Sequence, residues 1–135
     1  MKKAYFFING FLLKNEIVKD NDDVIRLDNQ YTYQIENFGV SKEFDSCVFG
    51  AIYDLIETDD REPKIIPNSY AAVFEIEVTD FDYNTIDESC NIADFDILKF
   101  IKNNQEKLVY SVMFDSEGKQ IENFINSADI KTGGE

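Results

Sequence analysis

The segment Tyr70–Val78 constrains the fold most strongly, because polar and apolar side chains alternate along it. In an extended strand, Phe74 and Ile76 would share one face, whereas Glu75 and Glu77 would share the other. A strand with one apolar face requires neighbouring strands and a second layer that covers this face. The pattern therefore predicts a sheet-containing domain with a core against that face.

Most of the other apolar runs are short and rich in aromatic and β-branched residues, which is typical of strands. The predicted strands are Ala4–Ile8, Val24–Leu27, Tyr31–Ile35, Cys47–Ile56 and Leu108–Phe114. Asn9-Gly10 is a turn signal that is expected to end the first strand. Phe11–Val18 is either a short helix or a second strand, Asn37–Asp45 is predicted to be a loop, and Ala93–Asn104 has the spacing of a helix.

The length of 135 residues, with 44% apolar and 14% aromatic residues, suits one domain with a hydrophobic core. The stretch Thr79–Asp96 holds six acidic residues and no basic one, so it is expected to be a solvated insertion rather than core. We therefore predict one α+β domain over residues 1–135, with a largely antiparallel or mixed sheet and an acidic insertion at about residues 79–107.

The charge of the chain is strongly unbalanced, since 27 acidic residues face 13 basic ones and the formal net charge is −14. This charge argues against binding to nucleic-acid phosphates and to anionic membrane surfaces. No apolar run approaches the roughly 20 residues of a membrane helix, and the apolar run near the N-terminus is too short for a secretion signal. A cytoplasmic location is therefore expected.

The sequence contains no histidine, which excludes an imidazole base and every metal site that uses histidine. Cys47 and Cys90 are far apart and fit no metal-ligand spacing, so both are expected to be reduced, buried thiols. The acids of Asp80–Asp96 lack the regular spacing of a calcium-binding loop. We expect neither a metal ion nor a cofactor.

Five short motifs follow one another in an order that adds information beyond each motif alone. They are residues 5–12 (YFFINGFL), residues 48–55 (VFGAIYDL), the Asp59–Glu62 pair, the strand opened by Tyr70, and the closing segments 110–112 and 125–130. Together they resemble the gamma-glutamylcyclotransferase-like family, which has an aromatic strand with a glycine loop, a second glycine motif, an Asp-x-x-Glu motif and two later strands. The resemblance covers nearly the whole chain except residues 79–107.

The resemblance implies a small mixed β-barrel flanked by short helices, with a pocket between the first glycine loop and the catalytic glutamate. It implies that Glu62 is the general acid/base that cyclises a gamma-glutamyl amine to 5-oxoproline. One carboxylate can make both proton transfers when burial raises its pKa towards neutrality. No cofactor is implied, because the nucleophile is tethered to its own target. The implied substrate-binding residues are Asn9, Gly10, Phe11, Leu12 and Tyr70.

Two residues of the first motif differ from the family pattern and leave two interpretations open. Asn9 stands where the family has tyrosine, and the bulky Phe11 stands where the family has a small hydroxyl residue. The chain is therefore either a cyclotransferase or a non-catalytic member that binds a ligand or a partner.

A second hypothesis treats the acidic surface itself as the functional feature. Small, very acidic proteins inhibit basic enzymes, as nuclease immunity proteins and DNA-mimicking anti-defence proteins do, because opposite charge speeds encounter and rejects wrong partners. The alternative for the acidic segment is a merely solvated loop. The predicted interface with a basic protein consists of Asp80, Phe81, Asp82, Tyr83, Asp87 and Glu88.

Overall fold

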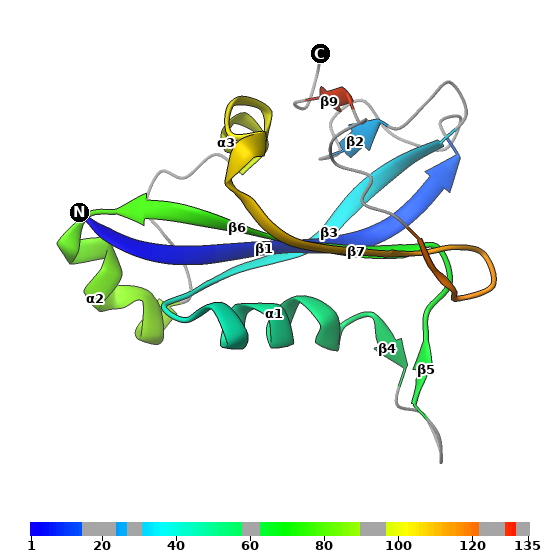
Figure 1. Cartoon of the computed structure of the whole chain (residues 1–135), viewed down its shortest axis with the longest axis horizontal. Coiled ribbons are helices and arrows are strands. Elements are labelled where there is room, and N and C mark those ends of the chain that lie inside the picture. Colours follow the sequence, from blue (N-terminus) through cyan, green and yellow to red (C-terminus); the bar gives the residue numbers. More distant parts are fainter. Residues whose placement is uncertain (15–23, 27–30, 58–62, 90–96, 122–128, 132–135) are drawn as a thin grey trace.

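The structure is a computed structural model that describes residues 1–14, 24–26, 31–57, 63–89, 97–121 and 129–131. Seven strands form one sheet in the order β8-β7-β6-β1-β3-β2-β9, and every neighbouring pair is antiparallel (Figure 1). The strands of this sheet are β1 (Lys2–Lys14), β2 (Val24–Arg26), β3 (Tyr31–Ser41), β6 (Ser69–Val78), β7 (Leu108–Phe114), β8 (Gln120–Ile121) and β9 (Asp129–Lys131). β4 (Ile56–Glu57) and β5 (Lys64–Ile65) pair separately.

The helices of the described residues cover both faces of the sheet. They are α1 (Phe44–Tyr53), α2 (Asp80–Ser89), α3 (Ile97–Asn103) and the short 3-10 helix η2 (Gln105–Lys107). α1 lies along one face, α3 lies on the opposite face, and α2 sits beside the end of the sheet where β1 begins (Figure 1). This arrangement confirms the α+β class. Among the described residues, none of these helices has both the length and the apolar surface needed to cross a membrane.

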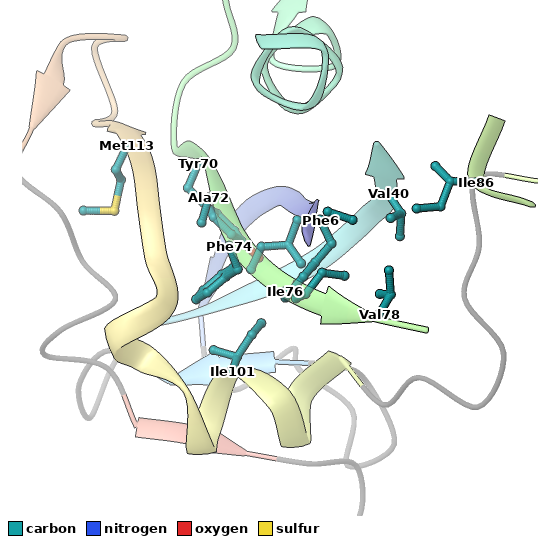
Figure 2. Packing of buried hydrophobic residues seen from close by; sticks show 12 residues of the cluster. Phe6, Val40, Tyr70, Ala72, Phe74, Ile76, Val78, Ile86, Ile101 and Met113 are labelled. Atoms are coloured by element: carbon teal, nitrogen blue, oxygen red, sulfur yellow. The ribbon is translucent and has the colours of Figure 1, made fainter. Parts of the chain in front are cut away.

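The central strand β6 confirms the alternation predicted for Tyr70–Val78. Phe74 and Ile76 lie in the core that α2 and α3 cover, where Phe74 stacks on Phe6 with ring centroids 5.0 Å apart (Figure 2). Val73 lies in the second core, under α1. β6 is therefore buried from both sides for most of its length. The second core consists of Cys47, Ala51, Leu55, Ala71, Val73 and Val112.

The described sheet is open, so the small mixed β-barrel implied by the family resemblance is not formed. β8 is at one edge, β9 is at the other, and they do not pair with each other. Closing a barrel requires strands long enough to continue the ladder around an interior, whereas β8 has two residues and β9 has three. Helices pack on both faces instead, which is a layered arrangement without an enclosed interior.

The turn predicted at Asn9-Gly10 is wrong, because β1 continues through both residues to Lys14. β1 lies between β3 and β6 over this stretch. The register with β3 shifts between Asn9 and Gly10, so the pair marks a bulge and not a reversal of the chain. The sequence allows either a helix or a strand for Phe11–Val18. Its described part, residues 11–14, is strand.

The strand predicted over Cys47–Ile56 and the loop predicted over Asn37–Asp45 are also wrong. β3 continues to Ser41, and α1 begins at Phe44. Periodicity alone does not distinguish a short apolar helix from a buried strand, and this run is apolar on more than one side. In the structure the buried positions Cys47, Ala51 and Leu55 are four residues apart, which is the spacing of one helix face.

The stretch predicted as an acidic insertion contributes to the core through its two helices. Ile86 of α2 and Ile101 of α3 are both buried against the sheet. The helix predicted over Ala93–Asn104 is confirmed over α3, and its residues 93–96 lie outside the described residues. Acidic composition therefore concealed the few apolar positions that attach these helices to the sheet.

The strand Leu108–Phe114 and the turn at Gly118 are confirmed. Gly118 has a φ of 79°, a left-handed conformation that glycine adopts without strain. The Asp115 carboxylate accepts hydrogen bonds from the backbone N–H groups of Lys119 and Glu117. These bonds, that from Lys119 first, lower the pKa of Asp115 below its usual value.

Candidate functional site

The residue predicted to be catalytic, Glu62, lies outside the described residues. The side chains of Leu12, Asp87 and Glu88 also lie outside the described part of the chain. The roles that the sequence assigns to these four residues stay predictions.

The structure brings the other predicted substrate-binding residues together on two neighbouring strands. Gly10 of β1 is the register partner of Tyr70 of β6, and Phe11 is the partner of Ser69. These positions are inside a strand that has neighbours on both sides, and Tyr70 is fully buried. Backbone groups in such a strand face the adjacent ladders. The expected glycine loop with outward-facing amides is therefore absent from this described segment.

Asn9 connects β1 to the end of α1 through its side chain. The residue is 1% exposed, and its Nδ2 atom donates hydrogen bonds to the Ala51 carbonyl oxygen and to Asp54 Oδ2, each at 3.1 Å. The last carbonyl groups of a helix lack partners within the helix, so a side-chain donor stabilises them. A residue predicted to bind substrate thus fixes the position of α1 and of the Asp54 carboxylate.

The ring of Phe7 fills the space between β3 and α1. A Cβ atom on Gly39 would lie 2.7 Å from Phe7 Cε1, and one on Gly50 would lie 3.3 Å from the same atom. Side chains at these two positions would occupy the volume of the ring, which explains why glycine stands at both. α1 therefore lies close to the sheet and packs against the ring of Phe7.

The outer face of α1 carries two exposed aromatic rings and Asp45, and Asp54 lies at the C-terminal end of the helix, where its carboxylate bonds to Asn9. Phe49 is 70% exposed and Tyr53 is 62% exposed, and their ring centroids are 6.0 Å apart. Asp45 lies one turn before Phe49 on the same line of the helix, and Asp54 directly follows Tyr53. Both acids are exposed. We call these four residues the α1 stripe.

The C-terminal end of the α1 stripe has a negative character beyond that of its side chains. The last turn of α1 contains no basic residue. The carbonyl end of a helix carries a partial negative charge, and cations are favoured there. Asp54 adds a full charge at this end, beside the exposed ring of Tyr53. The arrangement favours a positively charged ligand.

The interface predicted on α2 is exposed only in part. Asp80 is exposed, and Phe81 is 74% exposed. Tyr83 packs against the core, and its ring is approached by two lysine Nζ atoms of the same chain, Lys42 at 4.9 Å and Lys2 at 6.0 Å from the ring centroid. The cation-binding face of this ring is thus used within the molecule.

Asp82 of the predicted α2 interface has a structural partner. Its Oδ2 atom accepts a hydrogen bond from Thr79 Oγ1 at 2.9 Å, and its backbone N–H donates to the same hydroxyl at 3.1 Å. This reciprocal arrangement is a helix N-cap, and it ties Asp82 to the start of α2.

The α1 stripe does not emerge when this segment is interpreted as a strand. Read with a helical period, the same residues divide cleanly. Cys47 and Ala51 form the inner face, and Asp45, Phe49 and Tyr53 form the opposite face. The signal was therefore present in the sequence, and the choice of period hid it.

Cys47 is buried on the inner face of α1 and is a free thiol, as expected. Burial raises the pKa of the Cys47 thiol from 9.0 to about 12, so the thiol is neutral at physiological pH. Cys90 lies outside the described residues. Within the described ranges, no three cysteine, aspartate or glutamate side chains gather into a group that could hold a metal ion.

The surface features with the clearest chemical character are therefore the exposed rings and carboxylates of α1 and α2. On α2, the Tyr83 ring contacts two lysines of the same chain and the Asp82 carboxylate bonds to Thr79. Comparisons of the chain with models of known protein families, with curated proteins and with solved structures find no match.

Proposed function

We propose that this chain is an acidic binding protein that recognises a positively charged protein partner and covers a cationic surface on it. The observation that carries the proposal is the exposure of large aromatic rings together with carboxylates on α1 and α2. The net charge of −14 extends the same preference over the whole molecule. Inhibition of a basic enzyme is the activity that such a surface would serve.

Charge and aromatic rings contribute to binding in different ways. A strongly negative field steers a positive partner into contact and disfavours acidic competitors, and its effect falls as salt is added. Exposed aromatic residues supply the contact area that most often dominates interface energy, because they bury large surfaces with few rotatable bonds. Phe49, Tyr53 and Phe81 provide such rings next to acids.

The proposal is tested by identifying a partner and then measuring the complex with purified components. Proteins cross-linked to the chain in cells are identified by mass spectrometry, and the affinity of each is measured by calorimetry at several salt concentrations. We expect a basic partner whose affinity decreases steeply with added salt. A neutral or acidic partner, or an affinity that salt leaves unchanged, would contradict the proposal.

The cyclotransferase hypothesis is a second candidate, and one observation favours it. Gly10 and Tyr70, which the family resemblance assigns to the substrate, are register partners in neighbouring strands. In the proposed reaction the α-amine of the gamma-glutamyl group attacks its side-chain amide carbonyl, and the bond to the leaving amine breaks. Glu62 would take the proton from the attacking amine and deliver it to the leaving amine.

Release of 5-oxoproline from a panel of gamma-glutamyl compounds tests this second candidate. Release by the unmodified protein, abolished in Glu62→Gln, would support it. An absence of release from every compound would reject it, and this result would leave the binding proposal unaffected.

A further inference from the structure

We infer that the α1 stripe is the surface that contacts the basic partner, and that it selects arginine over lysine side chains. The inference rests on the proposed function, because it names the contact surface and the chemistry of that same partner. The stripe consists of Asp45, Phe49, Tyr53 and Asp54, as defined above.

One acidic helix of the chain, α2, already holds cations near an aromatic ring. On α2, the ring of Tyr83 is approached by the Nζ atoms of Lys42 and Lys2. A cation within about 6 Å of a ring centroid is attracted by the negative face of the ring. Lys2 is the first residue of β1, and Lys42 directly follows β3. Neither cation therefore belongs to α2. On α2 this chemistry is satisfied inside the molecule.

On α1 the same chemistry faces outwards. Phe49 and Tyr53 are the exposed rings, and the described contact between them is an aromatic one, at 6.0 Å. Within the part of the chain that the structure describes, the close lysine–ring contacts both involve Tyr83 of α2. Within these described ranges, the printed contact of Phe49 and Tyr53 is thus with each other, and both rings expose most of their surface to a partner.

Charge complementarity identifies the occupant as positive at both ends of the stripe. Asp45 lies in the first turn of α1, and Asp54 lies at its carbonyl end, where no basic residue offsets the helix dipole. The two rings lie between the two acids along the helix. A partner segment that carries positive side chains would thus meet carboxylates at its ends and aromatic faces in the middle.

The α1 stripe is held in place before any partner arrives. Cys47 and Ala51 on the inner face of α1 are buried, Gly50 lies against the ring of Phe7, and Asn9 donates to Asp54 Oδ2. A carboxylate accepts several hydrogen bonds, so Asp54 remains able to accept another from a partner. A surface that is already ordered loses less conformational entropy on binding.

Arginine fits this surface better than lysine does. A planar guanidinium group can stack on an aromatic ring while its N–H groups donate to a neighbouring carboxylate. A lysine ammonium group is a compact, strongly hydrated charge, and it satisfies these two contacts less well at the same time. A ring one helical turn from a carboxylate, as Phe49 is from Asp45, is therefore expected to distinguish two partners of equal charge.

The experiment compares octa-arginine with octa-lysine, two peptides of equal charge. Affinities are measured by fluorescence anisotropy of labelled peptide for the unmodified chain, for the double variant Phe49→Leu/Tyr53→Leu, and for the control Phe38→Leu on β3. Phe38 is the matched control because it is also an exposed ring, 55% exposed, and it lies outside both acidic helices. Circular dichroism and the unfolding midpoint verify that each variant is folded.

We expect octa-arginine to bind the unmodified chain more tightly than octa-lysine does, by about five- to tenfold. The double variant should lose this preference, because leucine keeps apolar surface but has no ring. Phe38→Leu should retain it. In a nuclear magnetic resonance titration, the largest shifts of backbone amides should fall within residues 45–54.

Three other results would each overturn one specific claim. Equal affinity of the two peptides for the unmodified chain would overturn the selection of arginine. An arginine preference that survives in the double variant, or disappears in Phe38→Leu, would overturn the assignment to α1 while the proposed function stands. Failure of both peptides to bind the unmodified chain at low salt would overturn the proposed function itself.

Discussion

Helices α1 and α2 have the same length of ten residues, and both carry acids and exposed rings, yet they are attached to the sheet in opposite ways. α1 is fixed at its C-terminal end by Asn9, and its N-cap residue Glu43 makes no side-chain capping bond. α2 is fixed at its N-terminal end by Thr79, and Lys42 and Lys2 approach its Tyr83 ring.

The difference shows that the residues that attach a helix to the sheet need not be the residues that would contact a partner. On α2, polar and aromatic groups that resemble a binding surface also hold the helix in place. On α1, buried residues of the inner face and the Asn9 amide hold the helix, so the outer face is left for contact with a partner. By its number of acidic and aromatic residues, α2 is the better candidate interface. By the contacts that these residues already make within the chain, α1 is the better candidate.

The largest expected effect tests whether the two faces of the sheet differ in the stability that they contribute. Phe74 and Val73 are adjacent in β6 and equally buried, but Phe74 faces α3 and Val73 faces α1. Phe74→Ala should lower the free energy of unfolding by about 3–5 kcal/mol. Val73→Ala removes fewer atoms and should cost about 2 kcal/mol. Chemical denaturation measures both, and equal costs would show that the cores do not differ in this way.

The second prediction uses the Cys47 thiol to report how tightly α1 stays on the sheet. In a Cys90→Ser background at pH 9, a thiol of pKa about 12 is rarely ionised, whereas the unfolded thiol, of pKa 9.0, is half ionised. Alkylation by iodoacetamide should therefore be on the order of several-hundred-fold slower in the folded chain, because the thiolate is the reactive form.

The pH dependence of this group has a definite sign. The folded pKa is raised, so the stability that Cys47 contributes is fully present below pH 9.0 and is lost as pH rises towards about 12. A matched probe on α2, Ile86→Cys with both natural cysteines replaced by serine, measures the opening of the other helix. Rapid alkylation of Cys47 in the folded chain would show that α1 lifts readily and is not the rigid helix described above.

The third prediction weakens the attachment of α1 alone. Asn9→Ala removes both hydrogen bonds to the end of α1 and should cost about 1–3 kcal/mol, because buried polar groups lose their partner. Hydrogen exchange should rise in the last turn of α1 and stay unchanged in α2. The control is Asn37→Ala, the exposed register partner on β3, which should change stability by less than about 0.5 kcal/mol. Equal losses from the two variants would refute the role of the Asn9 amide.

The smallest expected effect concerns the helix caps. Thr79→Ala should destabilise the protein by about 1 kcal/mol through α2, and Thr79→Ser should retain most of the stability. Glu43 has the extended backbone of an N-cap but makes no capping bond, so Glu43→Asp should stabilise the protein through α1, by about 0.5–1 kcal/mol. Thermal unfolding measures both changes. A loss in Glu43→Asp would show that the start of α1 cannot accept a side-chain cap.

The strands that could be predicted from the sequence are those whose local pattern agrees with their final environment. Polar and apolar residues alternate in β6, and β7 is a short apolar run between polar segments. The turn at Gly118 depends on a local left-handed conformation. For these segments, local preference and tertiary packing favour the same structure, and the prediction is confirmed.

The segments that could not be predicted depend on partners far away in the chain. β1 passes through Asn9-Gly10 because the Asn9 amide finds acceptors more than 40 residues later, which a turn signal does not reveal. α1 resembles a strand because the run is apolar on more than one side, so an alternating period competes with the helical one. The barrel implied by resemblance required a closure that the short edge strands do not provide.

The candidate site was predictable in its chemistry and not in its location. Acidic charge and aromatic residues indicated a cationic partner, and that hypothesis remains the one proposed. The choice of α2 as the interface could not account for Lys2 and Lys42, whose approach to Tyr83 depends on the complete fold. The α1 stripe became visible only when Phe49 and Tyr53 were placed on a helix.

The ring of Phe7 between Gly39 and Gly50 makes the orientation of α1 depend on three residues that are far apart in the sequence. A methyl group gained at either glycine would push the ring, and the ring would tilt the helix above it. Positions 7, 39 and 50 are therefore expected to change together in evolution. A homologue with alanine at position 39 should also have a smaller side chain at position 7. Surface recognition on the outer side of the helix would then evolve under a constraint imposed from beneath it.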